Sequence, residues 1–145
     1  VVHQTGESSH AAVSQAYLAA GREAEVVPFI DAMERRFAEA DLVLCRSGAT
    51  TCAELTAAGK ASILIPFARS ADDHQKKNAT EMQNAGAALM IEEAGLTGET
   101  LAAEIRGLLD DPKRIEAMET TSRRLGRPDA AARVADLLLP ESPRA

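Results

Sequence analysis

The segment Cys45–Glu54 combines small residues, hydroxyl groups and one acid in an order that suits the binding of a phosphate-containing ligand. Small residues at 47–49 follow the apolar run 41–45 and precede a helical pattern. A helix that begins there presents free backbone N–H groups, which bind anions at the carboxyl end of a strand. Glu54 comes within about the first helical turn, where its carboxylate can accept hydrogen bonds from a pair of sugar hydroxyls. The pattern predicts a metal-independent site for a nucleotide diphosphate.

Apolar runs that alternate with helical patterns surround this segment, which is typical of an α/β fold with a parallel sheet covered by helices. After the tail of a strand before Gly6, the predicted strands are 25–29, 41–45, 62–66 and 87–91. The first predicted helix follows Gly6, with Ser8 and Ser9 as caps, and the second follows Asp31. The third spans Thr51 to Ala58. The fourth runs through Asn78 and Met82 and ends at Gly86. Three more carry apolar residues at 101–108, 115–125 and 134–138, and Pro112 begins the second of these.

The composition of the 145 residues, 46% hydrophobic and 26% charged, is that of one soluble globular domain. We expect this domain to span 1–139, with a frayed tail at 140–145. A net charge of −6 argues against nucleic acid as a partner. The two cysteines, Cys45 and Cys52, are expected to be reduced and apolar, and the absence of an Asp-x-Asp pair argues against a bound metal.

The start of the chain has no initiator Met and lies within a strand pattern, so we expect a fragment that lacks at least one upstream strand and its loop. His3 is expected to be a structural hydrogen-bonding residue beside the sheet. Gly6 and Gly48 are expected where the backbone conformation lets a phosphate approach. Arg46 could pair with a neighbouring acid or steer a diphosphate, and the residues alone leave both possibilities open.

Several motifs together resemble the MurG family of peptidoglycan glycosyltransferases. The order and spacing of these segments match that family over nearly the whole chain: His3–Gly6, Phe29–Met33, Ala40–Ala49, Ile65–Phe67 and His74–Ala79. The resemblance is to the C-terminal, sugar-nucleotide-binding domain of a two-domain GT-B enzyme. It implies a Rossmann-like parallel sheet with helices on both faces and a helical C-terminus.

The resemblance also implies where a UDP-GlcNAc donor would bind. The uracil would lie at Phe29 and Ile30, and Glu54 would hold the ribose hydroxyls. The sugar hydroxyls would meet the pair His74 and Gln75, although some relatives carry Gln where this chain has His74. The remaining residues implied are Asn78, one helical turn later, and the loop along the uridine and diphosphate, Ser47, Gly48, Ala49, Thr50 and Thr51.

The reaction implied by the resemblance adds GlcNAc to undecaprenyl-pyrophosphoryl-MurNAc-pentapeptide, converting lipid I to lipid II in peptidoglycan synthesis. Transfer would proceed with inversion and need neither metal nor cofactor. The catalytic base, the lipid-linked acceptor and the contact with the cytoplasmic membrane would belong to an N-terminal domain outside this chain, so the fragment alone is expected to be inactive. The full-length protein would be cytoplasmic and peripheral on the inner face of the bacterial membrane.

Other interpretations remain open from the sequence. Phe29 and Ile30 could be plain core residues, and Glu54 could be a solvated helix residue. The domain could belong to another GT-B enzyme that uses a different UDP-sugar or a lipid acceptor such as diacylglycerol. It could also be a non-catalytic donor-binding subunit that acts with a membrane partner.

Overall fold

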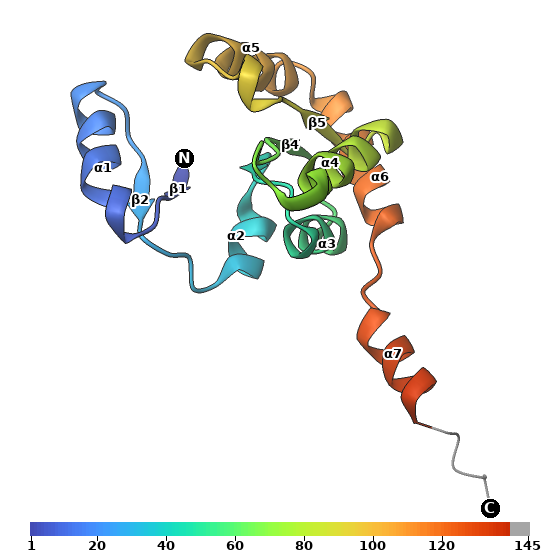
Figure 1. Ribbon diagram of the computed structural model, residues 1–145. Helices are drawn as coiled ribbons and strands as arrows, with labels where there is room; N and C mark the ends of the chain where they lie inside the picture. Colours follow the sequence, from blue (N-terminus) through green and yellow to red (C-terminus); the bar gives the residue numbers. More distant parts are fainter. Residues whose placement is uncertain (140–145) are drawn as a thin grey trace, which may run out of the picture. The chain divides into compact units, whose positions relative to one another are not determined.

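The computed structural model describes residues 1–139, and the predicted tail at 140–145 lies outside the described residues (Figure 1). The chain forms two compact units, one from Val1 to Arg36 and the other from Phe37 onward. Each unit contains parallel strands joined through helices, as the alternating sequence pattern predicts.

The first unit is a pair of parallel strands with one crossover helix. Strand β1 (Val2–Gln4) pairs with β2 (Glu25–Val27), and helix α1 (His10–Ala19) connects them after a short turn at Glu7–Ser9. Gly6 supports the turn after β1 with a φ of 71°, a conformation that L side chains disfavour.

Two side-chain hydrogen bonds hold α1 against these strands. His3 Nδ1 lies 3.2 Å from the Tyr17 hydroxyl, and His10 Nε2 lies 3.1 Å from the Val26 carbonyl oxygen. His3 therefore makes a hydrogen bond of the kind that the sequence analysis predicts. The predicted serine cap is wrong, because Ser9 continues the preceding turn in a right-handed helical conformation and makes no capping hydrogen bond.

The second unit holds a parallel sheet with the strand order β3-β4-β5. Its strands are β3 (Val43–Cys45), β4 (Ser62–Leu64) and β5 (Ala88–Met90), joined by helices α3 (Ala49–Ala58) and α4 (His74–Ala85). All three strands lie within the predicted runs. The apolar run 41–45 predicts a buried strand, but β3 is an outer strand of this sheet and its Leu44 is 44% exposed.

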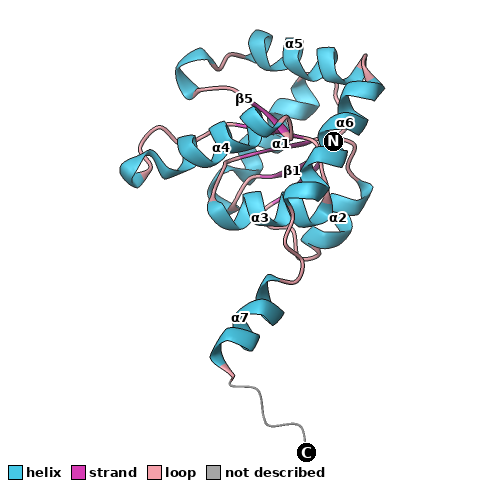
Figure 2. Ribbon diagram, turned by 90° about the vertical axis from the view of Figure 1, so that its right-hand side faces the viewer, coloured by secondary structure: helices cyan, strands magenta, loops and turns pink. Residues whose placement is uncertain are grey.

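Helices lie on both sides of this sheet, as predicted (Figure 2). Ala61 and Ile63 are fully buried against Leu108 of helix α5 (Gly98–Leu109) and Met118 of helix α6 (Pro112–Leu125). Helix α6 begins at Pro112 as predicted, and the Asp111 carboxylate caps it by accepting the Arg114 N–H at 3.2 Å.

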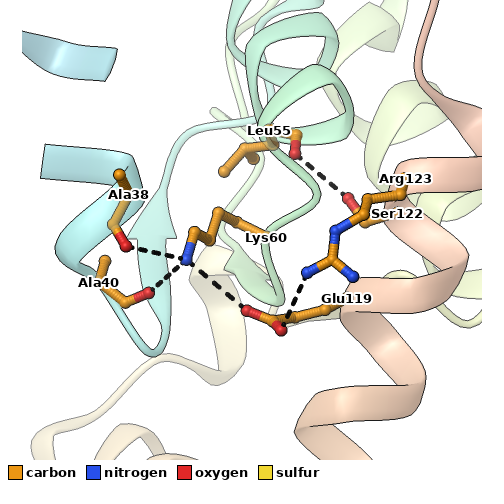
Figure 3. Close-up of polar contacts among 7 residues, drawn as sticks. All are labelled: Ala38, Ala40, Leu55, Lys60, Glu119, Ser122 and Arg123. Carbon is orange, nitrogen blue, oxygen red and sulfur yellow. Dashed lines mark hydrogen bonds and ion pairs between the residues drawn. The ribbon is translucent and has the colours of Figure 1, made fainter. Parts of the chain in front are cut away.

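Polar contacts secure the C-terminal end of α3 against α6 (Figure 3). Ser122 donates its hydroxyl to the Leu55 carbonyl at 3.3 Å. The Lys60 ammonium donates to the carbonyls of Ala38 and Ala40 at 3.4 and 2.9 Å and pairs with Glu119 at 3.7 Å. Ala38 lies in helix α2 (Met33–Glu39) and Ala40 directly follows it, so Lys60 connects the end of α2 to α6.

Helix α7 (Ala130–Leu138) forms where the sequence predicts the last helix. Its apolar side chains Val134, Leu137 and Leu138 are 55%, 86% and 75% exposed. Within residues 1–139, no helix combines the length and apolar character that crossing a membrane requires.

Candidate functional site

The N-terminus of α3, at the carboxyl end of β3, forms the centre of the candidate site. Gly48 is the N-cap residue, and the first intrahelical hydrogen bond runs from the Cys52 N–H to the Gly48 carbonyl at 2.9 Å. The N–H groups of Ala49, Thr50 and Thr51 therefore belong to the first turn, where a helix has no backbone partners for them. Ala49 and Thr50 are exposed, so this turn is accessible to an anion.

Gly48 leaves space beside this turn without needing a special backbone conformation. Its φ of −61° and ψ of 150° are open to any residue, and an added Cβ would meet only Thr51 Oγ1, at 3.8 Å. The expectation that Gly48 is required for its conformation is therefore wrong. An added Cβ would make only an ordinary van der Waals contact, so neither the backbone conformation nor the space around it requires glycine here.

Ser47 and Asn78 join the loop after β3 to helix α4. Ser47 is fully buried, and its hydroxyl donates to the Gln75 carbonyl at 2.8 Å. Asn78 Nδ2 donates to the Ser47 carbonyl at 3.0 Å. These contacts bring the candidates on α3 and α4 to the same edge of the sheet.

The start of α4 places the candidate sugar ligands. Gln75 Oε1 accepts the Phe67 N–H at 3.0 Å, and the Gln75 Nε2 group carries two further donors. His74 Nδ1 lies 2.6 Å from the Ala71 carbonyl, so this nitrogen carries the proton. Asp72 and Asp73 precede the helix with φ values of 47° and 53°, which turn the chain sharply into α4.

Glu54 lies further into α3 than the sequence suggested. The predicted helix began at Thr51, whereas α3 begins at Ala49 because Gly48 is its N-cap residue. Glu54 is therefore in the second turn, where the N-terminal dipole supports a carboxylate less strongly than in the first. Its side chain is exposed and available to hydroxyl donors.

Arg46 pairs with an acid, which is one of the two roles that the sequence left open. Its Nη2 lies 2.6 Å from Oε1 of Glu93, a residue that follows β5 and that no motif singled out. Glu93 Oε2 accepts the Ala68 N–H at 2.9 Å. The Ala68 N–H and then Arg46 hold the pKa of Glu93 below its ordinary value, so this interaction stabilises the fold above the unfolded carboxyl pKa and is lost as the pH falls through the lowered one.

Comparison with known proteins decides the family. The model of the glycosyltransferase family 28 C-terminal domain matches residues 1–134. The chain belongs to this family. The match covers both compact units of the structure.

Two curated proteins are similar to this chain in sequence over most of its length. A protein of Myxococcus xanthus is 53% identical over 136 residues, and one of Anaeromyxobacter dehalogenans strain 2CP-C is 51% identical over 139 residues. Both are named UDP-N-acetylglucosamine--N-acetylmuramyl-(pentapeptide) pyrophosphoryl-undecaprenol N-acetylglucosamine transferase. The chain aligns over 94% and 96% of its own length, but spans only 36% of either relative.

Solved structures share the family 28 fold. The crystal structure of Acinetobacter baumannii MurG is similar with a TM-score of 0.85 and 33% identity, over 94% of this chain and 41% of that one. The glycotransferase of kitacinnamycin shares the fold at a TM-score of 0.63 and 22% identity, over 96% of this chain and 35% of that one. The Rossmann-like architecture of a MurG-type C-terminal domain is therefore confirmed.

Phe29 and Ile30 belong to the first unit of this family 28 domain, after strand β2. Phe29 is 67% exposed, so it is not a core residue. The Ile30 N–H donates to Gln4 Oε1 at 2.9 Å. A base that uses this N–H would have to displace the Gln4 side chain.

Cys45 and Cys52 are free thiols on either side of the loop. Burial, and then the neighbouring Cys52, raise the pKa of Cys45 to about 12, and burial also raises the pKa of Cys52. Both thiols are therefore protonated at neutral pH. With raised pKa values, neither thiol is an activated nucleophile, and the expectation that both are reduced stays a prediction.

Proposed function

We propose that residues 1–139 form the UDP-GlcNAc-binding domain of the transferase that converts lipid I to lipid II. The observation that carries the proposal is the open N-terminus of α3, with Gly48 as its cap residue and Glu54 one turn further along, inside a family 28 domain. The names of the relatives support GlcNAc as the transferred sugar.

Each candidate residue has a chemical role in this proposal. The first-turn N–H groups of Ala49, Thr50 and Thr51 bind the diphosphate, and the carboxylate of Glu54 binds the ribose hydroxyls. Gln75 Nε2 donates to a hydroxyl of GlcNAc, with His74 beside it. Phe29 and Ile30 bind the uracil, while Ser47, Gly48 and Asn78 shape the loop that lies along the donor.

The proposed reaction is an inverting displacement that needs no metal. The acceptor hydroxyl attacks the anomeric carbon, and UDP departs as negative charge builds on its diphosphate. Preorganised N–H groups at the start of α3 stabilise that charge. We assign the catalytic base, the lipid-linked acceptor and the attachment to the inner membrane face to the remainder of the full-length protein, so this chain alone binds the donor without transferring it.

Calorimetric titration of the chain without added metal tests the donor assignment. We expect UDP-GlcNAc to bind more tightly than UDP or UDP-galactose, because Gln75 and His74 add contacts to the sugar. Preference for UDP-galactose would favour a different transferase of the same fold. Equal affinity for all three would contradict a GlcNAc site, and no binding would contradict a preformed donor site in this chain.

Replacing Gln75 by alanine separates sugar contacts from loop structure. We expect affinity for UDP-GlcNAc to fall by about two- to tenfold more than affinity for UDP, the effect of one neutral hydrogen bond. Gln83→Ala is a matched control, because Gln83 lies on the same helix and also accepts a backbone N–H, that of Met90 at 2.8 Å. Equal losses of affinity for UDP-GlcNAc and UDP would show that Gln75 does not contact the sugar.

A further inference from the structure

The loops that follow β3, β4 and β5 meet at one carboxylate. Glu93, after β5, uses its two oxygens separately: Oε1 pairs with Arg46 at 2.6 Å and Oε2 accepts the Ala68 N–H at 2.9 Å. Arg46 directly follows β3, and Ala68 lies in the loop after β4. Glu93 therefore connects three strand ends through charge-assisted hydrogen bonds, which are stronger than neutral ones.

Arg46 adds further contacts to the same loop after β4. Its Nη1 donates to the carbonyls of Ile65 and Pro66, both at 3.3 Å. The guanidinium also lies 5.5 Å from the centre of the Phe67 ring, a favourable cation–π distance. The Arg46 side chain is 49% exposed and that of Glu93 29%, so the pair is at the edge of the site and partly shielded from water.

Both loops held by this pair lead directly to candidate donor ligands. Arg46 is adjacent to Ser47, the first residue of the proposed diphosphate loop. Phe67 donates its N–H to Gln75, the proposed sugar ligand. Loss of the Arg46–Glu93 pair would therefore be expected to displace both the proposed diphosphate loop, next to Arg46, and the proposed sugar ligand Gln75, bonded to Phe67.

We propose that Glu93 is a positioning residue of the donor site, which fixes Arg46 and the loop at 65–70 so that the ligands on α3 and α4 keep one geometry. Glu93 acts through these partners and does not contact the donor. The expected effect on donor binding rests on the proposed function, whereas the effect on the loop does not.

A direct contact between Arg46 and the diphosphate predicts the opposite effect of a Glu93 substitution on donor affinity. If Arg46 were itself a diphosphate ligand, Glu93 would compete with the diphosphate for the guanidinium, and removing the carboxylate would strengthen binding. The contacts favour positioning, because both Nη groups of Arg46 already have protein partners: Nη2 faces Glu93 and Nη1 donates to the Ile65 and Pro66 carbonyls.

Three variants of the chain test the proposal: Glu93→Ala, Glu93→Gln and, as a matched control, Glu92→Ala. Glu92 is adjacent and forms its own ion pair, with Lys76 at 2.8 Å, but it is 53% exposed. The readouts are hydrogen exchange at the Ala68 amide and calorimetric affinities for UDP and UDP-GlcNAc.

We expect Glu93→Ala to speed Ala68 exchange about fivefold or more and to weaken both ligands about threefold. Glu93→Gln keeps an oxygen that can accept the Ala68 N–H, so it should restore most of the protection. Glu92→Ala should leave both readouts unchanged. Unchanged Ala68 exchange, or tighter UDP binding, in Glu93→Ala would overturn the proposal. If no form of the chain binds either ligand, the proposed function fails, and Ala68 exchange alone decides whether Glu93 fixes the loop.

Discussion

Replacing Glu54 by alanine is expected to weaken UDP-GlcNAc binding by about ten- to a hundredfold. A carboxylate that accepts hydrogen bonds from ribose hydroxyls contributes roughly 1.5 to 3 kcal/mol, which corresponds to that range of affinity. UDP should lose as much as UDP-GlcNAc, because the ribose is common to both. Calorimetry with the two ligands measures the effect, and their equal loss distinguishes a ribose contact from a sugar contact.

The control for this variant is Glu81→Ala, which removes an exposed acid from α4 instead of α3. Both substitutions place alanine in a helix, where it is well tolerated, so both variants should remain folded. Circular dichroism verifies this. Unchanged affinity in a folded Glu54→Ala chain would show that Glu54 does not bind the ribose and is a solvated helix residue.

The local elements of the fold were predictable because each rests on neighbouring residues. The continuous apolar run before Pro66 contains β4, and the glycines at 59 and 86 end α3 and α4 in the left-handed conformation that glycine favours. The beginning of α3 was less predictable. The sequence predicts Thr51 as its first residue, but Gly48 adopts the extended N-cap conformation, so the helix begins two residues earlier, at Ala49.

The contacts that assemble the candidate site were not predictable from local patterns. Ser47 bonds to a residue 28 positions away and Asn78 to one 31 positions away. Glu93 has no periodicity or motif that connects it with Arg46, since their proximity arises only when β3, β4 and β5 align in one parallel sheet. Periodicity also could not show that the apolar residues of α7 remain exposed.

The second large effect is expected at Gly126, directly after α6. Replacing it by alanine should lower the free energy of unfolding by about 1 to 3 kcal/mol, as overpacking commonly does. The added Cβ would lie 2.7 Å from the Thr56 carbonyl oxygen and 3.0 Å from its carbon. These are backbone atoms of α3, so no side-chain rotation can relieve the clash. The end of α6 would have to move, straining the Ser122 to Leu55 hydrogen bond.

Gly107→Ala provides the matched control with an effect of opposite sign. Gly107 lies inside α5, is exposed, and has no atom within 4 Å of an added Cβ. Alanine there should raise the free energy of unfolding by about 0.5 to 1 kcal/mol, because it lowers the entropy lost on helix formation. Urea unfolding followed by circular dichroism compares the two variants. Equal stability of Gly126→Ala and the parent chain would show that α6 can shift freely against α3. Because α3 carries both Gly48 and Glu54, such freedom would also weaken the argument that this helix holds a preformed donor site.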